Sequence, residues 1–406
     1  MQLSHLELEH FRNYTHLELA LEARCHIFHG RNAQGKTNLL EAIYYLVTTK
    51  SPLASSDREV IGWDATSEPI PYARLEGTFQ RANAPVTIEA TLMLETSSDP
   101  NETPRLCKQL RVNGVRRRAM DVLGQANAVL FMPQDIDLVT GSPSIRRRYL
   151  DGTLCQVDNA YCRTLSKYNR AVSQRNALLK RIRERQARPN ELSYWDQQVV
   201  TLGAHVLARR RSAMRELDTY ASQAHAELTA HKEHLSLRYI SSLQERATEA
   251  RIAPQAPAAD AAAIEAIWRR ALPALCGEEI GRGITVVGPH RDDLIFAIGG
   301  REASAYGSRG QQRTATLALK MAEMRLMTQA AGERPILLLD DVASELDSQR
   351  CQQLIEVVHA SDQVLITTTQ MDSLPPELRA EARSWHIQAG TVTRIADAAK
   401  PEAREG

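Results

Sequence analysis

Apolar and polar residues alternate with a period of two at several places along the chain, which is the pattern of half-buried β-strands. In the first run, residues 1–11, Leu6 and Leu8 alternate with polar residues before Phe11. Over residues 37–47 the apolar positions instead fall on one face of a helix. The sequence therefore predicts a helix there, and strands over residues 1–11, 17–21, 25–28, 72–79 and 86–94.

A different pattern begins near residue 146 and predicts two long helices. Apolar residues recur with heptad spacing, at 161, 165, 168, 172, 179 and 182, and again at 195, 199, 202, 206, 213, 217 and 220. The seam has one gap, at Arg175, and is interrupted at Arg188-Pro-Asn190. Two helices joined by so short a turn form an antiparallel hairpin, and a helix of about 27 residues is roughly 40 Å long. We expect an arm that projects from the rest of the protein.

Strand patterns return after the alanine- and proline-rich segment 253–263, at 285–287, 294–298, 336–339 and 364–368. Strands at both ends of the chain, with the helical pattern between them, predict an α/β domain into which the arm is inserted. The expected parts are an N-terminal head segment (1–145), an inserted arm (146–280), a C-terminal head segment (281–395) and a flexible tail (396–406).

Composition narrows the class of protein. The 406 residues carry a net charge of +1, so only local clusters of charge are informative about partners. None of the six cysteines belongs to a C-x-x-C pair, which argues against a zinc site and a disulfide framework. There is no run of 18 apolar residues, and the N-terminus lacks the features of a signal peptide. We therefore expect a soluble cytoplasmic protein.

The segment Gly30-Arg-Asn-Ala-Gln-Gly-Lys-Thr37 fits the phosphate-loop pattern G-x-x-x-x-G-K-[ST] without a mismatch. It also stands where that pattern requires, after a strand and before a helix. The glycines let backbone N–H groups turn toward phosphate oxygens, Lys36 reaches the β- and γ-phosphates, and Thr37 offers a hydroxyl to Mg²⁺. This segment predicts an ATP-binding site.

A second motif supplies carboxylates. The apolar run Pro335–Leu339 leads into Asp340 and Asp341. A carboxylate at the end of a strand beside the phosphate loop is placed to hold a nucleotide-bound Mg²⁺, so we assign that role to Asp340. Asp341 is then the candidate for positioning or deprotonating the attacking water. The alternative is that Asp341 only caps the following helix.

Basic residues gather in two regions, 105–118 and 163–188; the first contains no acid and the second contains one, Glu184. Such clusters suit DNA backbone phosphates, and the absence of a recognition helix predicts binding without sequence preference. A solvated helix face or a surface for a protein partner would explain the same pattern. The candidate DNA-binding residues are Arg111, Arg116, Arg117, Arg118, Arg175, Lys180 and Arg181.

Taken in order, the motifs resemble those of ABC-type ATPases: GRNAQGKT, a glutamine (Gln134) before the inserted arm, SRGQQ, and LLLDDVASELD. Within them the chain resembles the branch that contains the SMC heads, and more closely the RecF family. The RecF-like features are LEHFRNY (8–14), GPHRDD (288–293) and the short arm, and the resemblance extends to about residue 390. In GPHRDD we interpret His290 as a structural residue rather than a metal ligand.

The resemblance implies a role for each motif. The fold would be a P-loop ABC-type ATPase head built from both ends of the chain, with an inserted α-helical hairpin arm. Lys36 and Asp341 would act in catalysis, and Thr37, Gln134 and Asp340 would surround Mg²⁺. The ATP-binding residues would be Arg12, Asn13, Gly30, Arg31, Asn32, Ala33, Gln34, Gly35, Lys36 and Thr37. A signature loop acting in the second subunit's site would comprise Ser308, Arg309, Gly310, Gln311 and Gln312.

The resemblance also implies a function: an ATP-bound homodimer that binds duplex DNA and single-strand gap junctions and hydrolyses ATP weakly, stimulated by DNA. With RecO and RecR as partners it would help to load RecA in gap repair, replication restart and SOS induction. Asp341, Arg309 and Thr369 depart from the usual cassette residues (glutamate, glycine and histidine), which indicates slow hydrolysis. An ATPase subunit of a membrane transporter and a P-loop kinase are the alternatives. The arm argues against the transporter subunit, and the SRGQQ loop would have no purpose in the kinase.

Overall fold

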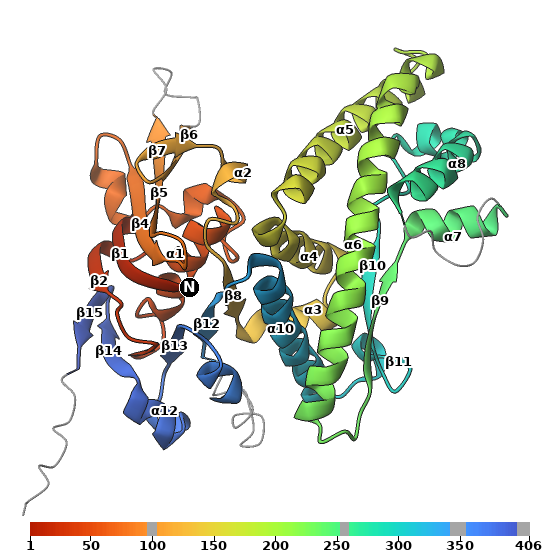
Figure 1. Cartoon of the computed structure of the whole chain (residues 1–406). Coiled ribbons are helices and arrows are strands. Elements are labelled where there is room, and N and C mark those ends of the chain that lie inside the picture. Colours follow the sequence, from red (N-terminus) through yellow and green to blue (C-terminus); the bar gives the residue numbers. More distant parts are fainter. Residues whose placement is uncertain (96–103, 252–259, 342–354, 396–406) are drawn as a thin grey trace, which may run out of the picture. The chain divides into compact units, whose positions relative to one another are not determined.

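The computed structural model describes residues 1–95, 104–251, 260–341 and 355–395 (Figure 1). The chain forms two compact units, one made of Met1–Asp135 with Glu323–Gly406 and the other of Ile136–Ala322. These borders differ from the expected ones, because residues 281–322 belong to the second unit rather than to the head. The reason is a strand pairing that joins β9, within the insertion, to β10, which follows it. The expected tail, 396–406, lies outside the described residues.

The first unit contains an antiparallel sheet in which alternate residues point into the core. Its strands, in spatial order, are β2 (Tyr14–Ala20), β1 (Gln2–Phe11), β4 (Tyr72–Gln80), β5 (Val86–Glu95), β6 (Arg105–Val112) and β7 (Val115–Arg117). Leu6 and Leu8 of β1 are buried, as the alternation predicted. They belong to a hydrophobic core that also contains residues of α1 (Lys36–Thr48) and of the second sheet.

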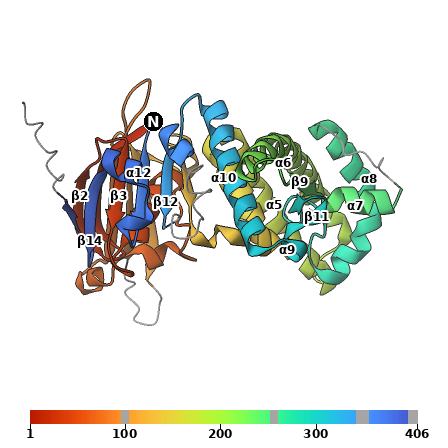
Figure 2. The same cartoon turned by 90° about the horizontal axis from the view of Figure 1, so that it is seen from below.

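The second sheet of this unit positions the phosphate loop. Its order is β15 (Thr391–Arg394), β14 (Arg383–Gln388), β3 (Cys25–His29), β13 (Val364–Thr368), β12 (Ile336–Asp340) and β8 (Ala128–Phe131). All neighbours pair in parallel except β14 and β15. Strands β14, β3 and β12 are seen together in Figure 2. Because parallel strands end at one edge, β3, β13, β12 and β8 bring the residues that follow them to the same side.

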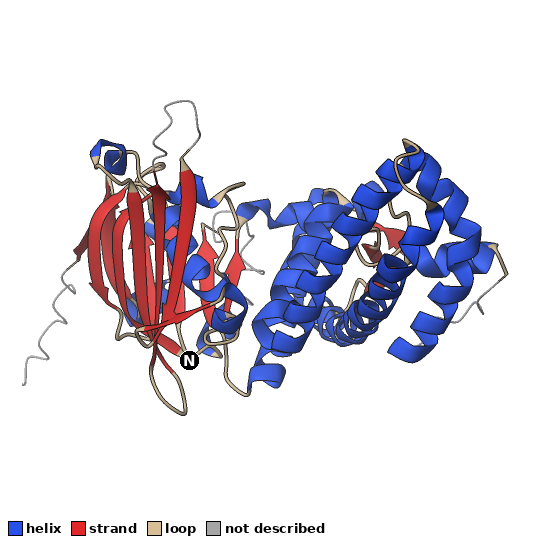
Figure 3. Cartoon of the chain, turned by 90° about the horizontal axis from the view of Figure 1, so that it is seen from above, coloured by secondary structure: helices blue, strands red, loops and turns tan. Residues whose placement is uncertain are grey.

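The first unit consists mainly of strands, which are red in Figure 3, with fewer helices, which are blue. Besides α1, its described part contains the short helices η1 (Asp57–Val60), η2 (Asp64–Ser67), α2 (Ala119–Val122), η3 (Pro133–Ile136), η6 (Met371–Ser373) and α12 (Pro376–Glu381).

The second unit is mostly helical, and the predicted hairpin is present. Helix α5 (Asn159–Arg183) leads through η4 (Pro189–Leu192) into α6 (Ser193–Leu228), and the two pack along each other (Figure 1). The remaining elements are α3 (Asp137–Thr140), α4 (Pro143–Val157), β9 (Leu235–Ile240), α7 (Ser242–Glu249), α8 (Ala261–Arg282), β10 (Asp293–Ile298), β11 (Arg301–Glu302), α9 (Ala303–Tyr306) and α10 (Arg309–Ala331), whose last residues belong to the first unit.

The gap in the heptad seam is filled by a buried ion-pair network. The side chain of Arg175 is 1% exposed; its Nε lies 2.7 Å from Asp196 Oδ1 and its Nη2 2.6 Å from Glu279 Oε2. Its Nη1 donates to the Thr285 hydroxyl at 2.9 Å. Arg175 therefore cannot reach DNA phosphates from this position. We remove it from the candidate DNA-binding residues.

The strand predicted over residues 285–287 is not formed. Backbone donors of this segment bond to side chains instead, Thr285 N to Asn176 Oδ1 at 2.7 Å and Val286 N to Glu279 Oε1 at 3.0 Å. The apolar run was therefore misread, because its partners are helices α5 and α8 and not a neighbouring strand.

The GPHRDD segment is a buried turn of the second unit. The His290 ring bonds to the Tyr168 hydroxyl at 2.7 Å and lies 3.2 Å from Thr285 O, and burial lowers the pKa of His290 to about 4. An imidazole that is neutral and hydrogen-bonded at both ring nitrogens agrees with the structural role expected for His290. Gly288 has a φ of +123°, and a Cβ there would lie 2.5 Å from atoms of Trp268 and Tyr168.

Replacing Gly288 with alanine is expected to destabilise the protein by about 3 kcal/mol or more, since it adds backbone strain to a steric clash. Equilibrium unfolding in urea measures the change. Gly277→Ala, on α8, is the matched control: a Cβ at Gly277 meets no atom within 4 Å, so this variant should be neutral or slightly stabilising. Equal stability of the two variants would contradict the packing argument.

Candidate functional site

The phosphate loop connects β3 to α1. Ala33 and Gly35 have φ values of +63° and +114°, so the chain turns sharply before the helix begins at Lys36. The Lys36 side chain folds back over the loop, and its Nζ donates to Gly30 O at 2.8 Å and to Arg31 O at 2.9 Å. The ammonium group is thus held against the turn where a nucleotide's phosphates would enter.

Lys36 is the main buried cation of this turn, with 7% of the residue exposed. Burial lowers its pKa, and the nearby carboxylates of Asp341 and Asp340 act in the opposite direction. A partly desolvated ammonium interacts more strongly with a phosphate than one in bulk water does.

Asp340 ends β12 and lies within a small hydroxyl network. The Thr37 hydroxyl donates to its two carboxylate oxygens at 3.0 and 2.8 Å. From β13, the Thr367 hydroxyl donates to Asp340 Oδ1 at 2.7 Å. Asp340 and Thr37 were predicted to lie close together around Mg²⁺, and the structure does bring them together; the metal itself stays a prediction, and Thr367 was missed. The sequence feature that could have indicated Thr367 is the polar end of the apolar run 364–368. This run forms β13, which lies between β3 and β12 in the sheet.

This oxygen-rich set suits a hard divalent cation. Burial raises the pKa of Asp340, a repulsive Asp341 adds to the effect, and the bonds from Thr367 and Thr37 and the charge of Lys36 oppose it. A buried carboxylate is costly while it is unpaired, so binding a cation stabilises it more than it would stabilise a carboxylate in water. Gln134, in η3 directly after β8, is exposed at the neighbouring strand end. Thr37, Asp340 and Gln134 are oxygen donors of the kind that Mg²⁺ prefers.

We expect Asp340→Asn to lower Mg²⁺-dependent ATP affinity about tenfold or more, because charge-assisted ligation is lost. Without nucleotide the variant should be at least as stable as the parent. The raised pKa means that the stability contribution of Asp340 is present at low pH and lost as pH rises through that pKa.

Melting temperatures across pH measure this difference, and the advantage of the variant should vanish in acid. Asp372→Asn, whose side chain is 96% exposed, is the control and should change neither property. A variant at position 340 with unchanged Mg²⁺ dependence would contradict the assignment.

Asp341 follows at a sharp backbone turn. Its φ is +48°, and its N–H lies 3.1 Å from both the backbone and hydroxyl oxygens of Thr367. The residues that would follow Asp341 in a capped helix, including the motif residues 344–347, lie outside the described residues. The alternative role of Asp341 as a helix cap therefore stays a prediction.

The LEHFRNY segment hydrogen-bonds to the backbone of the phosphate loop. Asn13 Nδ2 donates to Gln34 O at 2.9 Å, and the Tyr14 hydroxyl donates to Gly35 O at 2.9 Å. Arg12 forms a two-bond pair with the buried Glu41, at 2.9 and 2.7 Å. The structure therefore places Asn13 against the loop backbone and engages Arg12 with a carboxylate of α1, a contact that sequence reasoning missed.

The SRGQQ loop begins helix α10 and belongs to the second unit. Ser308 and Gln311 form a reciprocal cap: Gln311 N lies 3.3 Å from Ser308 Oγ, and Ser308 N donates to Gln311 Oε1 at 2.9 Å. Gln312 is buried, with its amide donating to Ala303 O at 2.9 Å. Arg309 is exposed and Gly310 half-buried. Ser308 thus has a local structural role in addition to any contact with nucleotide.

The remaining candidate DNA-binding residues differ in exposure and partners. Arg116, Arg117 and Arg118 are exposed at the edge strand β7 and just after it, and Lys180 and Arg181 are exposed at the end of α5. Arg111 is also exposed, but its Nη1 lies 3.4 Å from Glu89. Five of these six residues are thus exposed and have no ion pair among the described residues.

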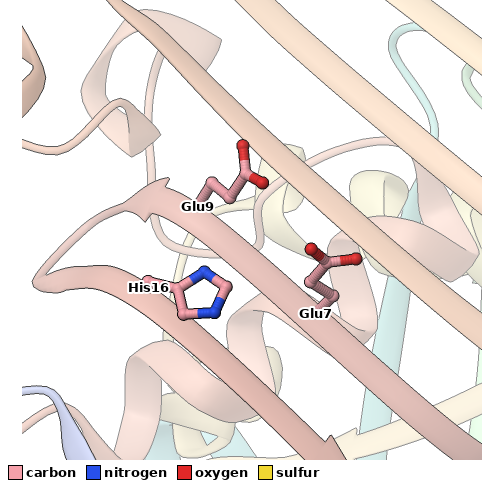
Figure 4. A group of neighbouring side chains, drawn as sticks. All are labelled: Glu7, Glu9 and His16. Atoms are coloured by element: carbon pink, nitrogen blue, oxygen red, sulfur yellow. The ribbon is translucent and has the colours of Figure 1, made fainter.

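One group outside this site has the composition of a metal site. Glu7, Glu9 and His16 lie together on the outer face of the antiparallel sheet (Figure 4). The guanidinium of Arg74 lies 3.2 Å from Glu7 and 3.6 Å from Glu9, and the Tyr72 hydroxyl donates to Glu9 at 3.1 Å. This guanidinium also pairs with Glu76 and Glu89, so its single positive charge offsets only part of the negative charge of these carboxylates. Because Arg74 already pairs with both Glu7 and Glu9, their proximity is accounted for without a metal.

Comparison with known proteins identifies the family. Residues 2–377 match the family model described as RecF/RecN/SMC N terminal domain. The DNA replication and repair protein RecF of Herpetosiphon aurantiacus is 42% identical over 400 residues, covering 97% of this chain and 99% of its own. The chain belongs to the RecF family. The RecF protein of Bacillus subtilis is 36% identical, covering 97% of this chain and 100% of its own.

Solved structures agree with this family and with the expected fold. A structure of the recombination mediator protein RecF with ATP has a TM-score of 0.83 at 29% identity, covering 97% of both chains. An Smc head from Pyrococcus furiosus, at 16% identity and a TM-score of 0.51, shares the fold alone. The predicted ABC-type head with an inserted helical arm is thereby confirmed. In the described part of the chain no helix combines the length and apolarity needed to cross a bilayer.

Proposed function

We propose that this chain is an ATP-dependent, DNA-binding recombination mediator that acts as an ATP-bound dimer. The observation that supports this most is the arrangement of Lys36, Thr37 and Asp340, which lies within one unit and has the donors and acceptors that a nucleotide and a cation would need. A relative at 29% identity has been solved with ATP. The SRGQQ loop belongs to the other unit and has no lysine of its own, so it lacks the means to form a complete phosphate site by itself.

In the proposed mechanism Lys36 and the loop N–H groups bind the triphosphate, and Thr37, Asp340 and Gln134 would hold Mg²⁺. The cation would neutralise charge that develops on the phosphates. Asp341, on the turn after Asp340, positions or deprotonates the attacking water. Ser308 and the N–H groups around Gly310 cover the γ-phosphate bound by the second copy. Each chain then contributes half of each ATP site.

Slow hydrolysis fits these residues. Asp341 is one methylene shorter than the usual glutamate, Arg309 replaces a glycine of the signature, and Thr369 replaces a histidine. ATP would then serve mainly to hold two copies together around DNA, with weak DNA-stimulated turnover releasing them.

The arm supplies a surface for DNA. Arg163, Lys167 and Arg170 are exposed at spacings of four and three residues, so they lie in one stripe along α5. The stripe leads toward Lys180 and Arg181, about 27 Å from Arg163 at helical rise. A line of cations of this length matches backbone phosphates without reading bases.

Family membership supports a biological role. We propose that the dimer binds duplex DNA and single-strand gap junctions in the cytoplasm and, with RecO and RecR as partners, helps to load RecA in gap repair, replication restart and SOS induction. The solved relative is named a recombination mediator in the RecFOR pathway. A transporter ATPase subunit would share the phosphate loop, but family membership and the basic arm favour DNA.

Sedimentation of the full chain tests this proposal, with gapped, duplex or no DNA, each with and without ATP and Mg²⁺. We expect the protein to sediment as a dimer only when ATP is present. When DNA is also present, this dimer should sediment together with the DNA. Absence of an ATP-dependent dimer on every DNA would overturn the proposal. Stable co-purification with an integral membrane protein would favour the transporter alternative.

A further inference from the structure

The turn at the end of the arm concentrates positive charge. We call residues 180–195 the arm tip. Its basic residues outnumber its acidic ones by five to two, and all seven are exposed. They are Lys180, Arg181, Arg183, Arg185 and Arg188 against Glu184 and Glu191. A surface of this charge attracts a polyanion.

The arm tip is also rigid. Beneath it a hydrophobic cluster is formed by Leu178, Leu179, Ile182 and Leu192, with Trp195 and Ile280 packed against it. The turn is fixed by backbone bonds, Arg185 N to Ile182 O at 2.9 Å and Gln186 N to Arg181 O at 2.8 Å. The backbone that carries the basic residues is therefore ordered before a ligand arrives, which reduces the entropy lost on binding.

One aromatic ring projects from this rigid, basic surface. Tyr194, in the first turn of α6, is 60% exposed. Its ring meets the buried cluster through Trp195, at 5.0 Å between centroids and 75° between planes. In the described residues of the second unit, Tyr194 and Tyr306 are the two large hydrophobic side chains that are exposed. Tyr194 therefore offers a ring that is open to solvent and held from behind.

We propose that the arm tip binds single-stranded DNA, with an unpaired base stacked on Tyr194 and the neighbouring phosphates held by the basic residues. An aromatic ring beside cations is the arrangement by which proteins bind single strands without sequence preference. The inference rests on the proposed DNA binding by the arm and adds the class of DNA that its end recognises.

The chemistry favours a single strand over an intact duplex. In a duplex the bases are stacked on each other, so a protein ring can cover a base only where the stack ends or the base is unpaired. The stripe of α5 would follow the duplex phosphates, and Tyr194 stands after the turn that ends this helix, at the start of α6. The arm would then touch paired and unpaired DNA at the same time, which is how it would locate a gap junction.

Fluorescence anisotropy with the full chain tests the proposal on three labelled DNAs: a duplex, a single strand of thymidines, and a duplex with a single-stranded tail. We expect Tyr194→Ala to weaken binding of the single strand and the tailed duplex about tenfold, and to leave the duplex unchanged. Tyr194→Phe should bind all three like the parent, because it keeps the ring. Gln197→Ala, an exposed residue of the same helix, is the matched control.

A photochemical experiment locates the contact. A 5-iododeoxyuridine at the first unpaired position of the tailed duplex should crosslink to Tyr194, identified by peptide mass spectrometry. Equal loss on duplex and tailed DNA, or unchanged single-strand binding by Tyr194→Ala, would overturn the inference and leave the proposed function standing. The second result would point to a protein partner at the arm tip. Failure of the parent chain to bind any DNA would overturn both.

Discussion

Lys36→Ala is expected to lower the affinity for ATP about 100-fold and to abolish the ATP-dependent dimer. The reason is that the Lys36 ammonium is the cation held inside the loop, 2.8 Å from Gly30 O and 2.9 Å from Arg31 O. Charge-assisted bonds to phosphate contribute about 1.5–3 kcal/mol, and a loss of 2.7 kcal/mol corresponds to about 100-fold. Titration with a fluorescent ATP analogue measures the affinity.

The control for this experiment is Lys50→Ala. Lys50 is exposed just after α1 and should tolerate the change with no effect on ATP. Melting curves of both variants check that the fold is kept. If Lys36→Ala still dimerised with ATP, the phosphate loop would not be the site that controls assembly.

Ser308→Asp should remove the ATP-dependent dimer and leave ATP binding by the monomer intact. Aspartate is a good helix cap, so it can accept the Gln311 N–H in place of the serine hydroxyl. Its charge would face the γ-phosphate bound by the second copy, and like-charge contact costs several kcal/mol, or more than about 100-fold in dimer affinity. Analytical ultracentrifugation with a slowly hydrolysed ATP analogue measures this loss, and phosphate release measures turnover.

Ser308→Asn separates capping from charge. Asparagine also caps a helix but is neutral, so this variant should retain most of the dimer. An equal loss of the ATP-dependent dimer in both variants would mean that the larger size of the side chain, and not its charge, prevents dimerisation. Loss of monomer ATP binding in Ser308→Asp would mean instead that the loop acts on the ATP of its own chain.

The sequence predicted the features that depend on local pattern. Strand alternation over residues 1–11, the heptad seam of the hairpin and the phosphate loop are each specified within a few turns of chain, and each is present. The Thr37–Asp340 contact was also predictable, although 303 residues separate them, because a phosphate loop and a strand-end aspartate have a known mutual arrangement.

Other features depended on partners that no local pattern reveals. Arg175 looked like a surface cation on a basic helix, but it is buried by Asp196 and Glu279, which lie 21 and 104 residues away. The segment 285–287 had the composition of a strand and found its partners on helices. The border of the second unit was misplaced for the same reason, since the pairing of β9 with β10 was not visible in either strand alone.

The place of β13 between β3 and β12 has a consequence for what substitutions can change. Two strand spacings of about 4.8 Å separate the strand that carries Lys36's loop from the strand that ends in Asp340. Backbone hydrogen bonds fix this distance, so side-chain substitutions should not change the width of the proposed site for phosphates and a cation. At Val364, Leu365 and Ile366, which are buried, apolar substitutions of similar size should therefore leave that width unchanged. Thr367 is the exception, because its hydroxyl is part of that site.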